Sequence, residues 1–184
     1  MTWKKSLPMW LTWSRIALCV PLVLILELVE RPLAGYIAAA MFIVASITDW
    51  LDGYFARRFQ AQSTMGKFMD PIADKILVST ILVLLIPLGN VGPVLVILLL
   101  TRDILIGGIR SVAAADRLII DAKATGKWKT GFQMVGIPCL LIETPLLGLP
   151  LIEIGRATLW ISVILSVISG WQYVALYRAG QAPR

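Results

Sequence analysis

The segment DWLDGYFARRFQAQSTMGKFMDPIADK, residues 49–75, places four carboxylates inside an otherwise apolar chain. Asp49 and Asp52 are three residues apart, and Asp70 and Asp74 are four apart, so each pair shares one face of a helix. Folding the chain back between the pairs would bring all four together. Clustered carboxylates are costly near lipid unless cations offset their charge. The pattern therefore predicts a site for two hard divalent cations, Mg²⁺ or Mn²⁺, held by these aspartates.

The composition predicts an integral membrane protein. Of the 184 residues, 58% are hydrophobic, and the mean hydropathy is +0.82, whereas soluble domains are about 45–50% apolar. The length suits a single domain over residues 1–184. The net charge of +6 indicates flanks that face anionic membrane lipids. Nucleic acid is not expected as a partner, because no basic run with interleaved aromatic residues occurs.

Six apolar runs predict an all-α protein whose six transmembrane helices form one bundle. The runs cover residues 16–29, 33–48, 65–88, 94–115, 131–149 and 157–177. The second helix is expected to continue to about residue 57, so that its last two turns are polar and include the first aspartate pair. The third helix is expected to include the second pair.

The distribution of positive charge predicts the orientation of the helices. Lysine and arginine are concentrated at both termini and in the connections between the second and third runs and the fourth and fifth runs. The other three connections contain only Arg31 and Arg156. By the positive-inside rule, both termini and the aspartates face the cytoplasm. The expectation is a multi-pass protein of the inner (cytoplasmic) membrane with its site on the cytoplasmic side.

One spaced pattern runs through the aspartate segment. It reads Asp49-x-x-Asp52-Gly53-x-x-Ala56-Arg57, then eight residues, then Gly66-x-x-x-Asp70-x-x-x-Asp74. At every defined position this pattern is similar to the signature of the CDP-alcohol phosphotransferase family. The resemblance implies a six-helix membrane enzyme that acts as a homodimer. It also implies transfer of a phosphatidyl or similar group from a CDP-linked lipid to an alcohol, with release of CMP.

The resemblance implies roles for individual residues. The chain has no histidine, and Asp74, the fourth aspartate, is the expected general base as well as a metal ligand. The stretch from Pro8 to Arg15 resembles an amino-terminal Pro-Asn-x-x-Thr-x-x-Arg element of the family, with Met9 at the asparagine position. Arg15 fits either a nucleotide contact or an interfacial cation. The residues expected to contact the CDP-linked lipid are Thr12, Asp52, Gly53, Ala56, Arg57 and Gly66.

Three cations are the candidates for binding an acceptor phosphate. Arg102 and Arg110 are eight residues apart and share a helix face, which is costly in a membrane unless that face borders a polar cavity. Lys127 begins the next helix. Lys129 fits equally a functional role and an ordinary positive-inside position, and Asp103 can pair in part with its neighbour Arg102.

The second half of the chain points to one acceptor. RDILIGGIR, residues 102–110, and GKWKTGFQM, residues 126–134, resemble the corresponding stretches of the phosphatidylglycerophosphate synthases within the family. This resemblance implies CDP-diacylglycerol as donor and sn-glycerol 3-phosphate as acceptor. Inositol phosphate or phosphatidylglycerol as acceptor is the alternative within the same chemistry.

A divalent-cation transporter is the alternative from another class, because such a protein also needs carboxylates within the membrane. It would not need Gly53, Ala56, Arg57 and Gly66 at their present spacing. Its acidic residues would also be expected on several helices around one path rather than on two adjacent helices. A structural assembly protein has no specific feature in its favour.

Overall fold

The computed structural model describes most of the chain. The backbone is described over residues 3–58, 64–115, 124–146 and 148–181. The side chains are described over residues 13–49, 51, 72–73, 75–109, 111–113, 126–146 and 148–177.

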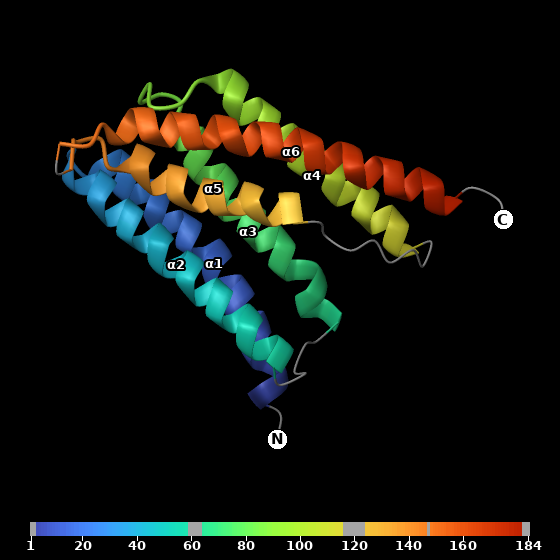
Figure 1. The fold of residues 1–184 in the computed structure, drawn as a ribbon. Coiled ribbons are helices and arrows are strands. Elements are labelled where there is room, and N and C mark those ends of the chain that lie inside the picture. The colour runs from blue at the N-terminus through green and yellow to red at the C-terminus, as the bar shows by residue number, and fades with distance from the viewer. Residues whose placement is uncertain (1–2, 59–63, 116–123, 147, 182–184) are drawn as a thin grey trace.

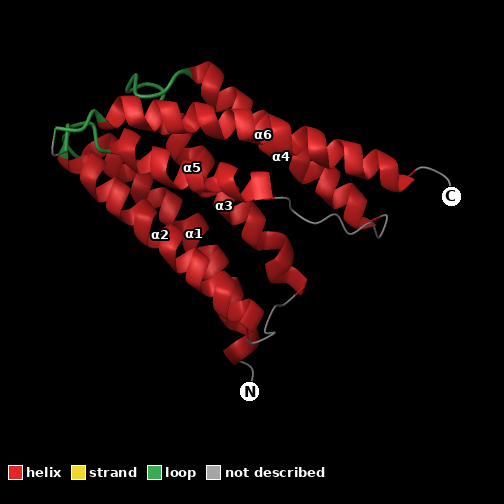
Figure 2. Cartoon of the chain, viewed as in Figure 1, coloured by secondary structure: helices red, strands yellow, loops and turns green. Residues whose placement is uncertain are grey.

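The described residues form six α-helices and no strand, which confirms the predicted all-α class (Figure 2). The helices are α1 (Trp3–Leu28), α2 (Leu33–Arg58), α3 (Thr64–Leu84), α4 (Pro93–Ala115), α5 (Ala124–Leu141) and α6 (Leu151–Gln181). Their number agrees with the number of apolar runs.

Several helix boundaries differ from the limits of the apolar runs, and α6 begins at Leu151 rather than at residue 157. The third helix ends at Leu84 rather than at residue 88, because Pro87 and Gly89 lie in the turn that follows, and Gly89 adopts a φ of 71°. Helix α5 covers Ala124–Leu141 rather than residues 131–149. Its polar first turns are helical, and Pro145 lies in the connection beyond its end.

Figure 1 shows the helices fanning out from one end of the molecule. The connections from α1 to α2 and from α5 to α6 lie at the closed end, while the two termini lie at the diverging ends of the helices. The carboxyl ends of α2 and α4 and the amino ends of α3 and α5 also lie on the diverging side. The aspartate positions of α2 and α3 are therefore on the same side of the molecule as the first turns of α5.

A polar network joins the three connections at the closed end. Glu143 forms an ion pair with Arg31 and accepts a hydrogen bond of 2.9 Å from Asn90 Nδ2. The same amide nitrogen donates to Leu140 O at 3.0 Å. Arg156 donates from Nε to Asn90 O at 2.8 Å and from Nη2 to Gly89 O at 2.6 Å. These bonds pair polar groups that would otherwise be costly to bury.

Small residues bring α5 close to both of its main neighbours. A Cβ at Gly155 of α6 would lie 2.7 Å from Leu140 Cγ and 3.0 Å from Gly136 O. A Cβ at Gly35 of α2 would lie 2.1 Å from Leu141 O. Glycine is therefore required where α6 and α2 approach α5, as is common between helices in membranes.

Among the described residues, only Leu151–Tyr177 is both long and apolar enough to cross a membrane by length and composition. Shorter apolar segments of the described residues are Leu33–Asp49 in α2 and Lys75–Leu84 in α3. The six membrane spans, the single bundle and the cytoplasmic termini therefore remain predictions.

Gly155→Ala should lower the free energy of unfolding by about 1–3 kcal/mol, because the added methyl overpacks the contact with Leu140. Gly131→Ala is the matched control, since a Cβ at this position in α5 meets nothing within 4 Å. The control should be neutral or stabilising by up to about 1 kcal/mol, the usual effect of replacing glycine in a helix. Thermal unfolding in detergent measures both variants, and equal stabilities would contradict the packing described.

Candidate active site

Both aspartate pairs lie on helices, as their spacing predicts. Helix α2 includes positions 49 and 52, and α3 includes positions 70 and 74 without interruption at Pro71. Each pair therefore occupies one face of its helix. Several predicted site residues have side chains outside the described ones: Thr12, Asp52, Gly53, Ala56, Arg57, Gly66, Asp70, Asp74 and Arg110. Their roles as metal, lipid or phosphate ligands remain predictions.

Asp49 forms an ion pair with Arg15 of α1. The arginine side chain is 8% exposed, whereas the aspartate side chain is 34% exposed. Arg15 is therefore a buried partner of the first aspartate rather than an exposed interfacial cation. The pairing compensates the charge of an arginine that would be costly to bury alone.

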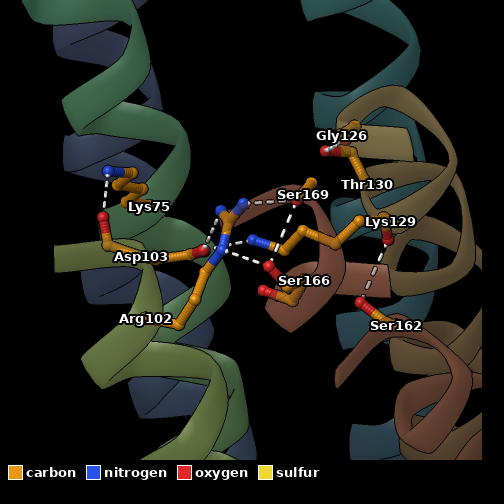
Figure 3. Close-up of polar contacts among 9 residues, drawn as sticks. All are labelled: Lys75, Arg102, Asp103, Gly126, Lys129, Thr130, Ser162, Ser166 and Ser169. Atoms are coloured by element: carbon orange, nitrogen blue, oxygen red, sulfur yellow. Dashed lines mark hydrogen bonds and ion pairs between the residues drawn. The ribbon is translucent and has the colours of Figure 1, made fainter. Parts of the chain in front are cut away.

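A polar junction, which we define as Lys75, Arg102, Asp103 and Lys129 with three serines of α6, joins four helices (Figure 3). The Asp103 carboxylate accepts hydrogen bonds from Lys129 Nζ and, at 3.1 Å, from Arg102 Nη1. The Asp103 main-chain oxygen accepts a hydrogen bond of 2.7 Å from Lys75 Nζ. One residue of α4 thus contacts a cation from α3 and another from α5.

Arg102 also connects α4 to α6. Its Nε donates to Ser166 O at 2.9 Å, and its Nη2 donates to Ser169 Oγ at 2.5 Å. Ser162, two helical turns before Ser169, donates to Lys129 O at 3.1 Å. The serines follow one face of α6, so the polar side of this helix is turned toward the junction (Figure 3).

The described side chains of the junction have an excess of positive charge. Two cations, Arg102 and Lys129, pair with the carboxylate of Asp103, whose side chain is 16% exposed, and Lys75 bonds to its main-chain oxygen. Gln133 lies one helical turn beyond Lys129 and is 4% exposed, and its Nε2 has no hydrogen-bond partner among the described residues. In the same part of the chain, Ser166 Oγ is also buried without a partner. This arrangement suits an anionic ligand with hydroxyl groups, because cations stand beside buried polar atoms that can still form hydrogen bonds.

The described side chains include two of the three predicted acceptor-binding cations, Arg102 and Lys127. Arg102 lies inside the junction, with its guanidinium bonded to Asp103 and to α6. Lys127 is exposed, and the side chain of Arg110 lies outside the described residues. The predicted partial pairing of Arg102 with Asp103 is confirmed.

Sequence reasoning did not identify the two junction lysines as members of one cluster. Lys129 is buried, with 5% of the residue exposed. A signal for its burial was present, because Lys129 lies four residues before Gln133 and eight before Ile137, both buried on the same face of α5. The apolar run begins only at residue 131, so the run alone did not include Lys129 in this periodicity. No comparable signal indicated the contact of Lys75 with α4.

Comparison with known proteins assigns the chain to a family. The family model described as CDP-alcohol phosphatidyltransferase matches residues 5–168. The chain belongs to the CDP-alcohol phosphatidyltransferase family. This family consists of membrane-associated enzymes of lipid biosynthesis that generally depend on divalent metal. Membership confirms the resemblance seen in the aspartate pattern and disfavours the cation transporter.

Two of the relatives share one name and are covered over nearly their full length. A protein of Rickettsia typhi named CDP-diacylglycerol–glycerol-3-phosphate 3-phosphatidyltransferase is 35% identical, over 92% of this chain and 95% of the relative. A protein of the same name from Bacillus subtilis is 34% identical, over 91% and 93%. A cardiolipin synthase (CMP-forming) of Oryza sativa is 36% identical over 94% of this chain but 56% of the rice protein.

Asp103→Asn should lower the free energy of unfolding by about 1.5–3 kcal/mol, because it weakens charged hydrogen bonds in a mostly buried junction. Combining it with Lys129→Met should cost less than the sum of the two single changes, since the buried ammonium that lost its partner is removed. Exposed Glu153→Gln is the control and should change stability by less than about 0.5 kcal/mol. Additive losses in the double variant would contradict the ion pair.

Proposed function

We propose that this chain transfers the phosphatidyl group of CDP-diacylglycerol to sn-glycerol 3-phosphate, giving phosphatidylglycerophosphate and CMP. The observation that carries the proposal is likeness, over nearly the full length of both chains, to relatives named for this reaction. The complete aspartate pattern supports the CDP-lipid half of the reaction. The cationic junction supports an acceptor that carries a phosphate.

The acceptor is assigned from charge. A phosphomonoester carries about two negative charges at neutral pH and is bound by several cations together. Arg102, Arg110 and Lys127 are the proposed phosphate ligands, and buried Lys129 adds a further positive charge beside Arg102. Gln133 Nε2, buried without a partner among the described residues, offers an amide donor for the hydroxyl groups of the glycerol backbone.

Phosphatidylglycerol is the second candidate acceptor, because one relative of comparable identity is named cardiolipin synthase. Transfer of a phosphatidyl group to phosphatidylglycerol gives cardiolipin by the same bond changes. Its phosphodiester brings one negative charge rather than about two, so it makes less use of the excess positive charge at the junction. Inositol phosphate would match the charge but has no named relative among those described above.

Two divalent ions, Mg²⁺ or Mn²⁺, fit the donor set of the site. Four carboxylates at helical spacing provide hard oxygen ligands, and the described one, Asp49, keeps a third of its side chain exposed. Asp49, Asp52, Asp70 and Asp74 would hold the ions. When bound, the ions polarise the phosphoryl oxygens as Lewis acids and offset developing negative charge.

The residues of the chain perform the remaining chemistry. Asp74 accepts the proton of the acceptor hydroxyl, and the hydroxyl oxygen forms a bond to the β-phosphorus, the one that bears diacylglycerol. The bond from this phosphorus to the bridging oxygen breaks, and CMP leaves with the electron pair. Arg57 contacts the pyrophosphate, and Gly53, Ala56 and Gly66 allow the donor to approach the helix backbones.

The proposed location is the inner (cytoplasmic) membrane, with six spans, cytoplasmic termini and the active site on the cytoplasmic side. Large apolar side chains of α4 and α6 support burial of these helices in lipid. Ile104, Leu105 and Trp171 are 72%, 61% and 74% exposed, and large apolar side chains exposed to this extent are better accommodated by lipid than by water. A homodimer is proposed on the family resemblance.

Purified wild-type protein with CDP-diacylglycerol should release CMP when sn-glycerol 3-phosphate is added, and the lipid product should be phosphatidylglycerophosphate. Parallel reactions contain phosphatidylglycerol, inositol phosphate or no acceptor. Chelation with EDTA should abolish CMP release, and excess Mg²⁺ or Mn²⁺ should restore it. If phosphatidylglycerol supported turnover and sn-glycerol 3-phosphate did not, the assignment of the acceptor would be wrong. Full turnover after extensive dialysis against EDTA would overturn the proposed metal site.

Asp74→Asn should reduce kcat by at least about 10²–10⁴-fold, the usual effect of losing a general base, with lost metal ligation adding to it. Binding of CDP-diacylglycerol, measured separately, is expected to persist in part. Asp103→Asn is the matched comparison and should leave metal affinity nearly unchanged, because Asp103 lies on α4 among cations. A near-native rate for Asp74→Asn would exclude this residue from both roles.

A further inference from the structure

Lys75 connects two helices through a hydrogen bond from its ammonium to a main-chain oxygen. Its ammonium extends from α3 to the Asp103 main-chain oxygen on α4, with an Nζ–O distance of 2.7 Å (Figure 3). This oxygen lies within a helix, where it also serves as the acceptor for the amide of residue 107. A carbonyl has two lone pairs, so it can accept both hydrogen bonds.

The contact depends on the absence of a side chain at position 107. A Cβ added to Gly107 would lie 2.7 Å from Lys75 Nζ, closer than such atoms approach in proteins. A Cβ added to the adjacent Gly108 would meet no described atom within 4 Å. A side chain at 107 would therefore displace the ammonium from its position at the Asp103 oxygen, whereas a methyl at 108 would not.

The contact joins two helices that otherwise touch little. Helices α3 and α4 pack together far less than α5 with α6 or α1 with α3. Lys75 directly follows Asp74, while Asp103 is bonded through its carboxylate to Lys129 of α5. The Lys75 contact therefore links the helix with the second aspartate pair to the helices that form the cationic junction.

We propose that the bridge from Lys75 to the Asp103 carbonyl, seated over Gly107, sets the position of Asp74 relative to the acceptor cations. Lys75 and Gly107 are positioning residues in this proposal, which rests on the proposed phosphatidyl transfer. The bridge aligns the donor half of the site, on α2 and α3, with the acceptor half, on α4 and α5. Each half keeps its own ligands when the bridge is lost, but the two reacting groups no longer meet correctly.

Gly107→Ala tests the proposal, with Gly108→Ala as the matched control. Both changes add one methyl to the same helix, so their effects on helix propensity are alike. Gly107→Ala should lower kcat by about 10–10²-fold through misplacement of the reacting groups, with KM for both substrates close to wild type. Gly108→Ala should stay within about twofold of wild type in kcat, as expected for a change with no neighbour.

Lys75→Met provides a second test that adds no atom at the contact. It removes the ammonium, so it should reduce kcat to a similar extent, and Gly107→Ala should then cause no further loss. Equal kcat for the two alanine variants would overturn the proposal. So would independent effects of Lys75→Met and Gly107→Ala, or a rise in KM for sn-glycerol 3-phosphate with unchanged kcat, which would make Lys75 a binding residue.

Thermal unfolding separates this proposal from the proposed reaction. The variants measured are Gly107→Ala, Gly108→Ala, Lys75→Met and the double variant that combines Lys75→Met with Gly107→Ala. Non-additive changes in Tm between positions 75 and 107 are expected because the two positions share one contact. If wild-type protein releases no CMP with any acceptor, the reaction is wrong, and the Tm values still test the bridge. Additive Tm changes would overturn the bridge even where the wild-type enzyme is active.

Discussion

The carboxylate of Asp103 is the constraint on which the junction depends. A charge taken out of water is stable only when partners replace its hydration. Here the partners come from α4 and α5, and the main-chain oxygen of the same residue binds a cation from α3. Arg102 extends the set to α6. Four helices are thus fixed by polar contacts at a point where apolar packing alone would not define their relative positions.

The two ends of the molecule use polar residues differently. At the closed end, Glu143, Arg31, Asn90 and Arg156 form a compact network that ties the connections together. At the junction, described cations outnumber the described carboxylate, and Gln133 has a buried donor without a partner. Among the described residues, each end has a buried polar atom without a partner, Arg31 Nη2 at the closed end and Gln133 Nε2 at the junction. The excess of cations over carboxylates among its described side chains distinguishes the junction and suits it to an anionic ligand.

Sequence periodicity predicted the helices well, because the helix period governs apolar runs and acidic pairs alike. The second helix ends within one residue of its predicted end, and both aspartate pairs lie on helices. Polarity misled the prediction at the start of α5, where tertiary contacts hold lysine inside the protein. The contact of Lys75 with Asp103 could not be predicted, since it joins residues that are 28 apart in sequence and depends on how α3 and α4 approach each other.

Both substrates of the proposed reaction are anionic, so bringing them together is an electrostatic problem before it is a chemical one. Carboxylates with bound metal suit the pyrophosphate of the donor, and lysine and arginine suit the phosphate of the acceptor. These two kinds of site must lie close together, yet direct contact would let the aspartates and the cations neutralise one another. The aspartates lie on α2 and α3, whereas the proposed acceptor cations lie on α4 and α5, so the two sets do not share a helix. The hydrogen bond from Lys75 to the Asp103 main-chain oxygen links α3 to α4, and the glycine at 107 leaves room for the ammonium at that oxygen.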